Sequence, residues 1–260
     1  MAYITSKDGT QIAFDRSGSG PAIILVDGAF CHRAFGPMKP LTPFLEPHFT
    51  VIAYDRRGRG ESGDTLPYAV EREVEDIDAL IQEVGGEAFL YGTSSGAALV
   101  LEAAAHGLNV KKMALYEPPF NSDSDALQRA ADYTARLNEL LAAGKRGDAA
   151  ALFMSYVGTP EEAIAGAKQS PAWGALESVA PTLAYDNAIL GTGAVPTGKA
   201  ATVTVPTLLL TGGATIPFMH ETARALAASM PNAEHRVIEG QTHDIQPDAI
   251  APVLIEFFKA

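Results

Sequence analysis

Short apolar runs alternate with longer amphipathic segments along most of this chain. Continuous apolar runs of this length are typical of strands buried on both faces. Buried strands of this kind are predicted at residues 22–26 and 50–54, and further strands at 110–116, 205–211 and 234–238. Residues 70–84 repeat apolar positions at helical spacing, with acidic residues on the opposite face. This alternation of strands and helices predicts an α/β fold with a mostly parallel sheet and helices on both of its faces.

Two parts of the chain depart from this alternation. The first fifteen residues alternate apolar and polar positions around Asp8-Gly9, which predicts an antiparallel edge hairpin with a two-residue turn. Residues 121–200 contain helical patterns with no strand between them. These helices are expected near residues 125–143, 148–157, 161–168 and 180–190. We therefore expect an α/β core formed by residues 1–120 and 201–260, and an inserted helical cap at 121–200.

One strand-to-helix junction carries the strongest chemical signal. An apolar run ends in Gly92-Thr93-Ser94-Ser95-Gly96 and passes directly into an Ala/Leu-rich segment. In this context Gly-x-Ser-x-Gly predicts a nucleophile elbow, in which a strained turn exposes the Ser94 hydroxyl and the glycines avoid backbone collisions. The alternative interpretation is a polar turn that caps a helix, since Ser is a preferred N-cap residue.

A serine hydroxyl needs a base and an orienting acid to act as a nucleophile. His243 follows the last predicted strand, at the same sheet edge as Ser94, and is the candidate base. Glu117 comes directly after the strand at 110–116, whereas no acid follows the strand at 205–211. We therefore assign Glu117 as the acid, which preserves the order Ser, acid, His. The alternative role for Glu117 is an ordinary ion pair in a Pro-rich loop.

An oxyanion intermediate needs two backbone N–H donors. One is expected from Ser95 and the other from Ala29, in the loop after the strand at 22–26. Cys31 is an alternative nucleophile, but it lacks the elbow context and is better explained as a buried or pocket-lining thiol. Large side chains near strand ends or in the cap are expected to line an apolar acyl pocket, with cap packing as the alternative role: Phe30, Phe120, Trp173 and Met219.

Two other motifs lack the context that their chemistry needs. Residues 58–63 fit the dinucleotide-binding pattern Gly-x-Gly-x-x-Gly, but Gly63 leads into a Pro-containing loop and not into a helix, which favours a structural loop. His220-Glu221 begins like a zinc-protease motif, but Arg224 stands where the second histidine is required. The sequence therefore predicts neither a bound nucleotide nor a metal site.

Composition narrows the class of protein further. The chain has 260 residues, of which 47% are hydrophobic, enough for one large core and an insertion. The formal charge of -12, with scattered Lys and Arg, argues against a nucleic-acid or anionic-membrane partner. No apolar run reaches the about 18 residues of a membrane span. One cysteine excludes an internal disulfide, and the N-terminus lacks an apolar signal core, so we expect a cytoplasmic protein, either a monomer or a homodimer.

These motifs together resemble the α/β-hydrolase superfamily over nearly the whole chain. The resemblance rests on the elbow at 92–96, the Asp-Arg-Arg-Gly-Arg-Gly-Glu-Ser loop at 55–62, the Gly-Gln-Thr-His segment at 240–243, and the cap. It implies an eight-stranded, mostly parallel sheet, a Ser nucleophile and no cofactor. The serine at the elbow argues against the dehalogenase and epoxide-hydrolase branches, which use Asp there.

Two positions differ from the pattern of many members of the superfamily. Asp27 stands where many members have His, which affects the local support of the oxyanion loop but not its backbone donors. Thr215 stands where many members have Asp, after the seventh strand. Branches that place the acid after the sixth strand fit Glu117 instead.

These observations predict a serine hydrolase that cleaves a carboxylic ester of a small molecule through an acyl-enzyme. Lactones, acyl-homoserine lactones included, and carbon-carbon bonds are alternative targets, and perhydrolysis with peroxide is a further alternative. From another class, a ligand receptor can keep the fold and turn over slowly. The complete Ser, Glu and His set favours an enzyme, because a binding module has no need of all three.

Overall fold

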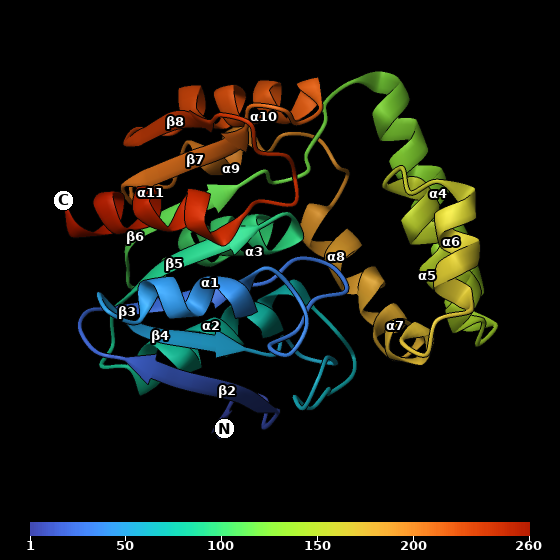
Figure 1. The fold of residues 1–260 in the computed structure, drawn as a ribbon, viewed down its shortest axis with the longest axis horizontal. Helices are drawn as coiled ribbons and strands as arrows, with labels where there is room; N and C mark the ends of the chain where they lie inside the picture. The colour runs from blue at the N-terminus through green and yellow to red at the C-terminus, as the bar shows by residue number, and fades with distance from the viewer.

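A single eight-stranded sheet forms the centre of the computed structural model, which describes residues 1–260 (Figure 1). The strand order is β1-β2-β4-β3-β5-β6-β7-β8, with β1 and β2 antiparallel at one edge and the strands from β4 to β8 parallel. The strands are β1 (Ala2–Thr5), β2 (Gln11–Gly18), β3 (Ala22–Val26), β4 (Thr50–Tyr54), β5 (Ala88–Thr93), β6 (Val110–Tyr116), β7 (Thr207–Gly212) and β8 (Ala233–Ile238). The predicted fold class is confirmed.

The first hairpin differs from its prediction in one detail. β1 and β2 form the expected antiparallel edge pair, but five residues, not two, separate the strands. The Ser6 N–H donates to the Thr10 carbonyl at 2.8 Å, and the Thr10 N–H donates to the Asp8 side chain at 3.0 Å. The expected two-residue turn is wrong because Asp8 closes a wider loop, in which its carboxylate also reaches Arg57.

Helices cover both faces of the sheet, as expected from strands without an exposed side. Ile24 and Val26 of β3 belong to a core of 30 buried residues that packs against α2, α3 and α10, whereas Ile23 and Leu25 belong to a second core of 18 that packs against α1 and α11. The bounds of these helices are α1 (Met38–Leu45), α2 (Val70–Glu83), α3 (Ser95–Ala105), α10 (Pro217–Ser229) and α11 (Pro247–Lys259).

Helix α2 carries charges in its buried face. Its apolar residues are buried as predicted, namely Val74, Ile77, Leu80 and Ile81. Glu73 and Asp76 were expected among the acids of the solvated face, but both are about 1% exposed. They are buried because they form ion pairs with Arg56 and Arg57 of the loop after β4.

The chain between β6 and β7 forms helices only, and we call residues 121–200 the insertion. Its helices are α4 (Ser124–Ala142), α5 (Arg146–Tyr156), α6 (Glu161–Lys168), α7 (Trp173–Val179), α8 (Leu183–Leu190) and α9 (Thr197–Ala200), with a short 3-10 turn before α8. Sequence periodicity did not predict α7 or α9, because helices of 7 and 4 residues are too short to show a repeat.

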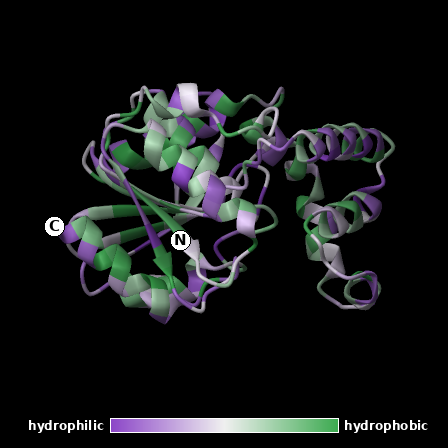
Figure 2. Ribbon diagram, turned by 90° about the horizontal axis from the view of Figure 1, so that it is seen from above, coloured by the Kyte–Doolittle hydropathy of each residue, from purple (hydrophilic) through white to green (hydrophobic).

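The insertion stands beside the α/β part as a lobe of mixed hydropathy (Figure 2). Nine buried residues, drawn mostly from α4, α5 and the segment around α7, hold its helices together. Within the insertion, helix α8 lies between helices α4 to α6 and the sheet (Figure 1), and it packs against α3. None of the helices in the structure combines the length and apolarity needed to cross a membrane.

Candidate active site

Ser94 lies in a strained turn between β5 and α3. Its φ of 53° and ψ of -128° are rare for a residue with a side chain. The turn is held by a bond from the Ser94 N–H to the Tyr116 carbonyl, at 2.9 Å. A Cβ at Gly92 would lie 2.5 Å from the Gly96 carbonyl oxygen, and one at Gly96 would collide with the Val26 carbonyl. The glycines are therefore required by the close approach of the backbone, as the elbow predicts.

Backbone strain gathers at one edge of the sheet. Three residues other than glycine have positive φ, namely Phe30 at 63°, Ser94 at 53° and Glu117 at 48°. They follow β3, β5 and β6, whose carboxyl ends are neighbours in the parallel sheet. Such conformations cost roughly 1 to 3 kcal/mol each and persist where the surroundings enforce them, often at functional sites.

Glu117 is fully buried and holds three donors. His243 Nδ1 lies 2.7 Å from Glu117 Oε2, the Thr215 hydroxyl donates to the same oxygen at 3.1 Å, and the Gly212 N–H donates to Oε1 at 2.8 Å. A bond from Nδ1 to a carboxylate requires the proton on Nδ1, which leaves Nε2 of His243 free to accept one. Thr215 therefore supports the acid that follows β6 instead of replacing it.

Tyr116 connects the segments that carry the three candidate residues. Its carbonyl accepts the Ser94 N–H, and its hydroxyl donates to the carbonyl of Thr242, next to His243. Tyr116 is also the residue before Glu117. Because this side chain is buried within the sheet, it holds the elbow and the histidine loop to the same strand.

The two expected oxyanion donors lie beside the elbow. The Ala29 N–H donates to no acceptor within the chain. Ser95 is the first residue of α3, so its N–H has no acceptor inside the helix. A Cβ at Gly28 would lie 3.7 Å from Ser94 Oγ, which shows how closely this loop approaches the serine. Both N–H groups are therefore free to receive an oxyanion.

The four expected pocket residues divide between different packing environments. The Phe30 ring meets Phe153 of α5 edge to face, with centroids 4.9 Å apart, and Trp173 packs against the same cluster of the insertion. Phe120 belongs to the core on the α3 face of the sheet, and Met219 is buried on α10. The structure thus brings Phe30 and Trp173 to one cluster, but not together with the other two.

Two groups of the loop after β3 have raised pKa values. Burial is the main reason why the pKa of Asp27 rises to about 8, although Arg59 and Arg56 oppose the rise. Asp27 Oδ1 is buried with no hydrogen-bond partner. Burial also raises the pKa of Cys31 to about 12, so this thiol is protonated at neutral pH and is a poor nucleophile.

The loop at 55–63 proves to be a structural element. Gly60 has a φ of 54°, and a Cβ there would collide with the Asp55 carboxylate, which accepts the N–H groups of Arg33 and Glu61. The next helix, α2, begins only at Val70, so no helix N-terminus faces the glycines. This geometry supports the structural interpretation over the nucleotide site.

Sequence reasoning missed the ionic cluster that this loop forms. Arg56 and Arg59 are each about 1% exposed, and both pair with Asp186 of α8. Three arginines in a short, glycine-containing loop are a signal for buried ion pairs. The sequence offers 31 acidic residues, however, and nothing local to the loop identifies the partner.

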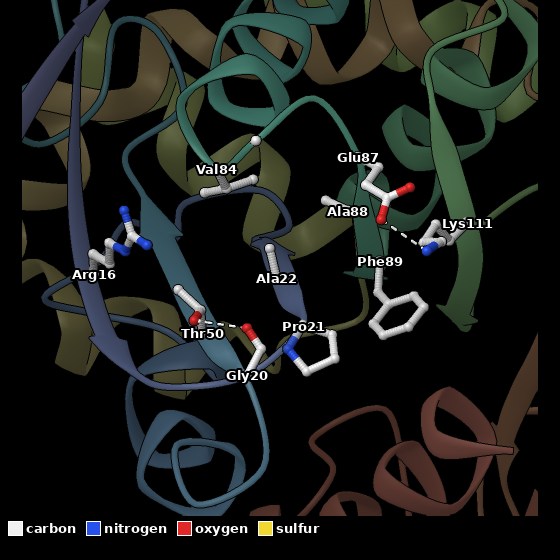
Figure 3. A pocket seen from close by; sticks show the side chains of 11 residues that line it. Arg16, Gly20, Pro21, Ala22, Thr50, Val84, Glu87, Ala88, Phe89 and Lys111 are labelled. Carbon is white, nitrogen blue, oxygen red and sulfur yellow. Dashed lines mark hydrogen bonds and ion pairs between the residues drawn. The ribbon is translucent and has the colours of Figure 1, made fainter.

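A polar cavity of about 360 Å³ lies at the opposite edge of the sheet (Figure 3). It opens at the first residues of β3, β4 and β5, where Thr50 donates to the Gly20 carbonyl and Lys111 pairs with Glu87. None of its 11 lining residues is a Ser, Cys, His or Asp. None of the candidate catalytic residues lines this cavity.

Comparisons with known proteins agree with this arrangement. A sequence model of the alpha/beta hydrolase family matches residues 18–253. An alpha/beta hydrolase from Sphaerobacter thermophilus is 50% identical, with a TM-score of 0.89, and the match covers 99% of this chain and 100% of that one.

Two more distant structures share the fold. An esterase from Thermogutta terrifontis is 22% identical, with a TM-score of 0.74 over 99% of this chain and 97% of that one. An enol-lactonase from Burkholderia xenovorans is 21% identical, with a TM-score of 0.72 over 100% of both chains. Since the family model spans most of the sequence and the strained serine lies at the elbow of this fold, the chain belongs to the alpha/beta hydrolase family.

Proposed function

We propose that this hydrolase cleaves carboxylic esters of small molecules through a Ser94, His243 and Glu117 triad, without a cofactor. The observation that carries the proposal is the 2.7 Å contact between Glu117 and His243 at the sheet edge where Ser94 takes its strained conformation. The insertion acts as a cap over this edge in the same proposal.

In the proposed reaction, His243 Nε2 takes the Ser94 proton as the hydroxyl attacks the ester carbonyl carbon. The carbonyl oxygen becomes an oxyanion and receives the N–H groups of Ala29 and Ser95. The imidazolium returns its proton to the leaving alcohol, and the acyl group stays on Ser94. Water, deprotonated by His243, then attacks the acyl carbon, and the imidazolium returns this proton to Ser94 Oγ as the acid leaves. Glu117 keeps Nδ1 protonated and stabilises the imidazolium throughout.

The charges near the serine favour a substrate that has no carboxylate of its own. The arginines nearest to the oxyanion loop, Arg56 and Arg59, are buried and committed to Glu73 and Asp186. Neither has a free donor face to hold an anion. A neutral ester therefore fits this site better than an anionic one.

The enol-lactonase shares this fold, and so does a meta-cleavage product hydrolase at 19% identity, so lactones and carbon-carbon bonds remain the alternative targets. A lactone would react at its carbonyl with the same five groups, namely the side chains of Ser94, His243 and Glu117 and the N–H groups of Ala29 and Ser95. A receptor with slow turnover is the alternative from another class.

The test is proton release by the purified protein with neutral esters of increasing acyl length, matched esters that carry a carboxylate, and lactones. The Ser94→Ala variant is the blank and is expected to lose on the order of 10⁴-fold or more in turnover. An acyl-enzyme is expected as a mass increase on Ser94 after rapid quenching. Fast turnover of lactones without turnover of esters would favour the lactonase. The absence of turnover with every compound would favour the receptor.

A further inference from the structure

Asp186 of α8 is a buried carboxylate that reaches from the insertion into the α/β part. Its Oδ1 accepts from Arg56 Nη1 at 2.8 Å, from Arg59 Nη2 at 2.9 Å and from the Ser95 hydroxyl at 2.8 Å. Its Oδ2 accepts from Arg59 Nη2 at 2.8 Å. All of these partners lie outside the insertion.

Each partner of Asp186 also lies at, or next to, the backbone that carries a proposed oxyanion donor. Ser95 itself supplies one N–H. Arg59 Nη1 donates to the carbonyl of Gly28, and Arg56 Nη1 donates to the carbonyl of Asp27 at 3.3 Å. The Gly28 carbonyl and the Ala29 N–H belong to the same planar peptide unit and point in opposite directions. An arginine that fixes this carbonyl therefore fixes the direction of the second donor.

Asp186 is the carboxylate that pairs with Arg59, and it shares Arg56 with Glu73. Burial by itself would raise its pKa, but Arg59 and Arg56 outweigh burial and hold the pKa below the usual range. The group is therefore an anion at neutral pH. An amide in its place would keep the shape but would lose the charge that both guanidinium groups face.

Helix α8 is well held in the position that this role requires. Tyr185, the neighbour of Asp186, donates to Asp64 at 2.7 Å. Its ring stacks on Tyr68, with centroids 3.8 Å apart. The bond from the Tyr185 hydroxyl to Asp64 involves neither Ser95 nor the two arginines, so its removal offers a matched control.

We propose that Asp186 is a positioning residue for both oxyanion donors, acting on Ser95 directly and on Ala29 through Arg59. The inference rests on the proposed ester hydrolysis. It assigns to the insertion a part in the chemistry itself, because the insertion supplies a charge that orients the donors without contacting the substrate.

The test compares Asp186→Asn with wild type on a neutral ester. We expect kcat to fall about 10- to 100-fold, a fraction of the about 10² to 10³ that losing one whole donor costs, with KM changed less than about threefold. The rate at which a fluorophosphonate labels Ser94 should fall by a similar factor, because the phosphoryl oxygen uses the same donors. Full labelling at the end point would show that every molecule is folded and active.

Tyr185→Phe removes a contact of the same helix and should leave kcat and the labelling rate within about twofold of wild type. Ser95→Ala removes one of the Asp186 bonds with little risk to folding and should lower kcat by a few fold. A folded Asp186→Asn protein with the kcat of wild type would overturn the proposal. An equal loss in Tyr185→Phe would also overturn it, because the effect would then be general loosening of α8.

If Asp186→Asn does not fold, the Ser95→Ala variant tests the positioning role instead. A wild-type kcat in that variant overturns the proposal. The labelling experiment separates this proposal from the proposed ester hydrolysis. Wild-type protein that labels rapidly at Ser94 but cleaves no ester would contradict the substrate class alone. Equal labelling rates in wild type and Asp186→Asn would contradict the positioning role alone.

Discussion

Glu117 combines the strongest local constraints of any single residue at the candidate site. It has no exposed surface, a positive φ of 48° and three donors on its carboxylate. Glu117→Gln keeps the volume but turns an N–H of the amide, or a neutral oxygen, towards His243. We expect kcat to fall about 10³- to 10⁴-fold, because the histidine loses the tautomer that the reaction needs.

The matched control for this substitution is Asp244→Asn, an exposed acid next to His243 in the chain. Its kcat should stay within about threefold of wild type. Steady-state ester hydrolysis measures both variants. A reversal of the two effects would place the acid at position 244.

The raised pKa of Asp27 predicts that the stability of the folded protein falls as pH rises. Its folded pKa of about 8, raised by burial, exceeds the ordinary value of 3.8. Below about pH 4 both states are protonated, and stability does not depend on this group. Between about pH 4 and 8 only the unfolded state ionises, so folding loses free energy as pH rises, on the order of 5 kcal/mol in all, and the loss is complete above pH 8.

Asp27→Asn removes this titration. Its unfolding free energy relative to wild type should therefore increase from pH 5 to pH 9, as measured by urea denaturation at both values. Asp78→Asn, on the exposed side of α2, is the control and should show no such trend. A constant difference between Asp27→Asn and wild type across this range would mean that Asp27 is ionised in the folded protein.

At the scale of elements, buried ion pairs join the loop at 55–63 to α2. Arg57 is fully buried, donates twice to Asp76 at 2.7 and 2.8 Å, and reaches Asp8 of the first hairpin at 2.8 Å. One guanidinium thus holds together a loop, a helix and the edge hairpin. Such a pair stabilises little relative to apolar residues, but breaking it leaves a buried charge.

Arg57→Leu should lower the unfolding free energy by about 3 to 5 kcal/mol at pH 7, because Asp76 loses its partner. Adding Asp76→Leu should recover part of this loss. Arg16→Leu is the control, since this exposed arginine forms no ion pair in the structure, and it should change stability by less than about 0.5 kcal/mol. Urea denaturation measures all three. A loss as small as that of the control would mean that Asp76 is protonated or rehydrated without cost.

At the scale of the whole molecule, two contacts join the insertion to the loop after β3. Phe30 of that loop enters the apolar cluster of α4, α5 and α7, and Asp186 of α8 reaches the arginines beneath the same loop. The loop after β3 is therefore held between the sheet and the insertion. A change in how the insertion packs should therefore alter the conformation of this loop more than that of the sheet.

Phe30→Ala removes the apolar contact and should loosen the insertion, since deleting a buried Phe costs about 3 to 5 kcal/mol. We expect amide hydrogen exchange to accelerate at least about tenfold in α4 and α5, with β5 and β6 unchanged. Phe258→Ala is the control. Its ring stacks on Phe89 in the core beside α1 and α11, far from the insertion, so its effect should stay there. Equal acceleration in both variants would mean that the molecule opens as a single unit.

Much of the fold could be predicted because its signals are local. Three strands have the predicted bounds, residues 22–26, 50–54 and 110–116, because apolar residues make up most of a strand that is buried on both faces. The elbow was visible because only glycine tolerates the backbone contacts on both sides of Ser94. The placement of Glu117 followed from strand ends alone, because neighbouring parallel strands bring their carboxyl ends together.

The tertiary structure alone decided which charges pair. Arg56 and Asp186 are 130 positions apart, and nothing in the pattern around either residue identifies the other. Glu73 and Asp76 each stand four residues before a buried residue of α2, Ile77 and Leu80, but nothing local shows that arginines of a preceding loop pair with them. The periodicity of a sequence reports how a segment meets the core, whereas the partner of a buried charge depends on what the folded chain brings beside it. The sequence by itself therefore determined the sheet, the elbow and the choice of candidate triad, and folding decided how the insertion reaches the loop after β3.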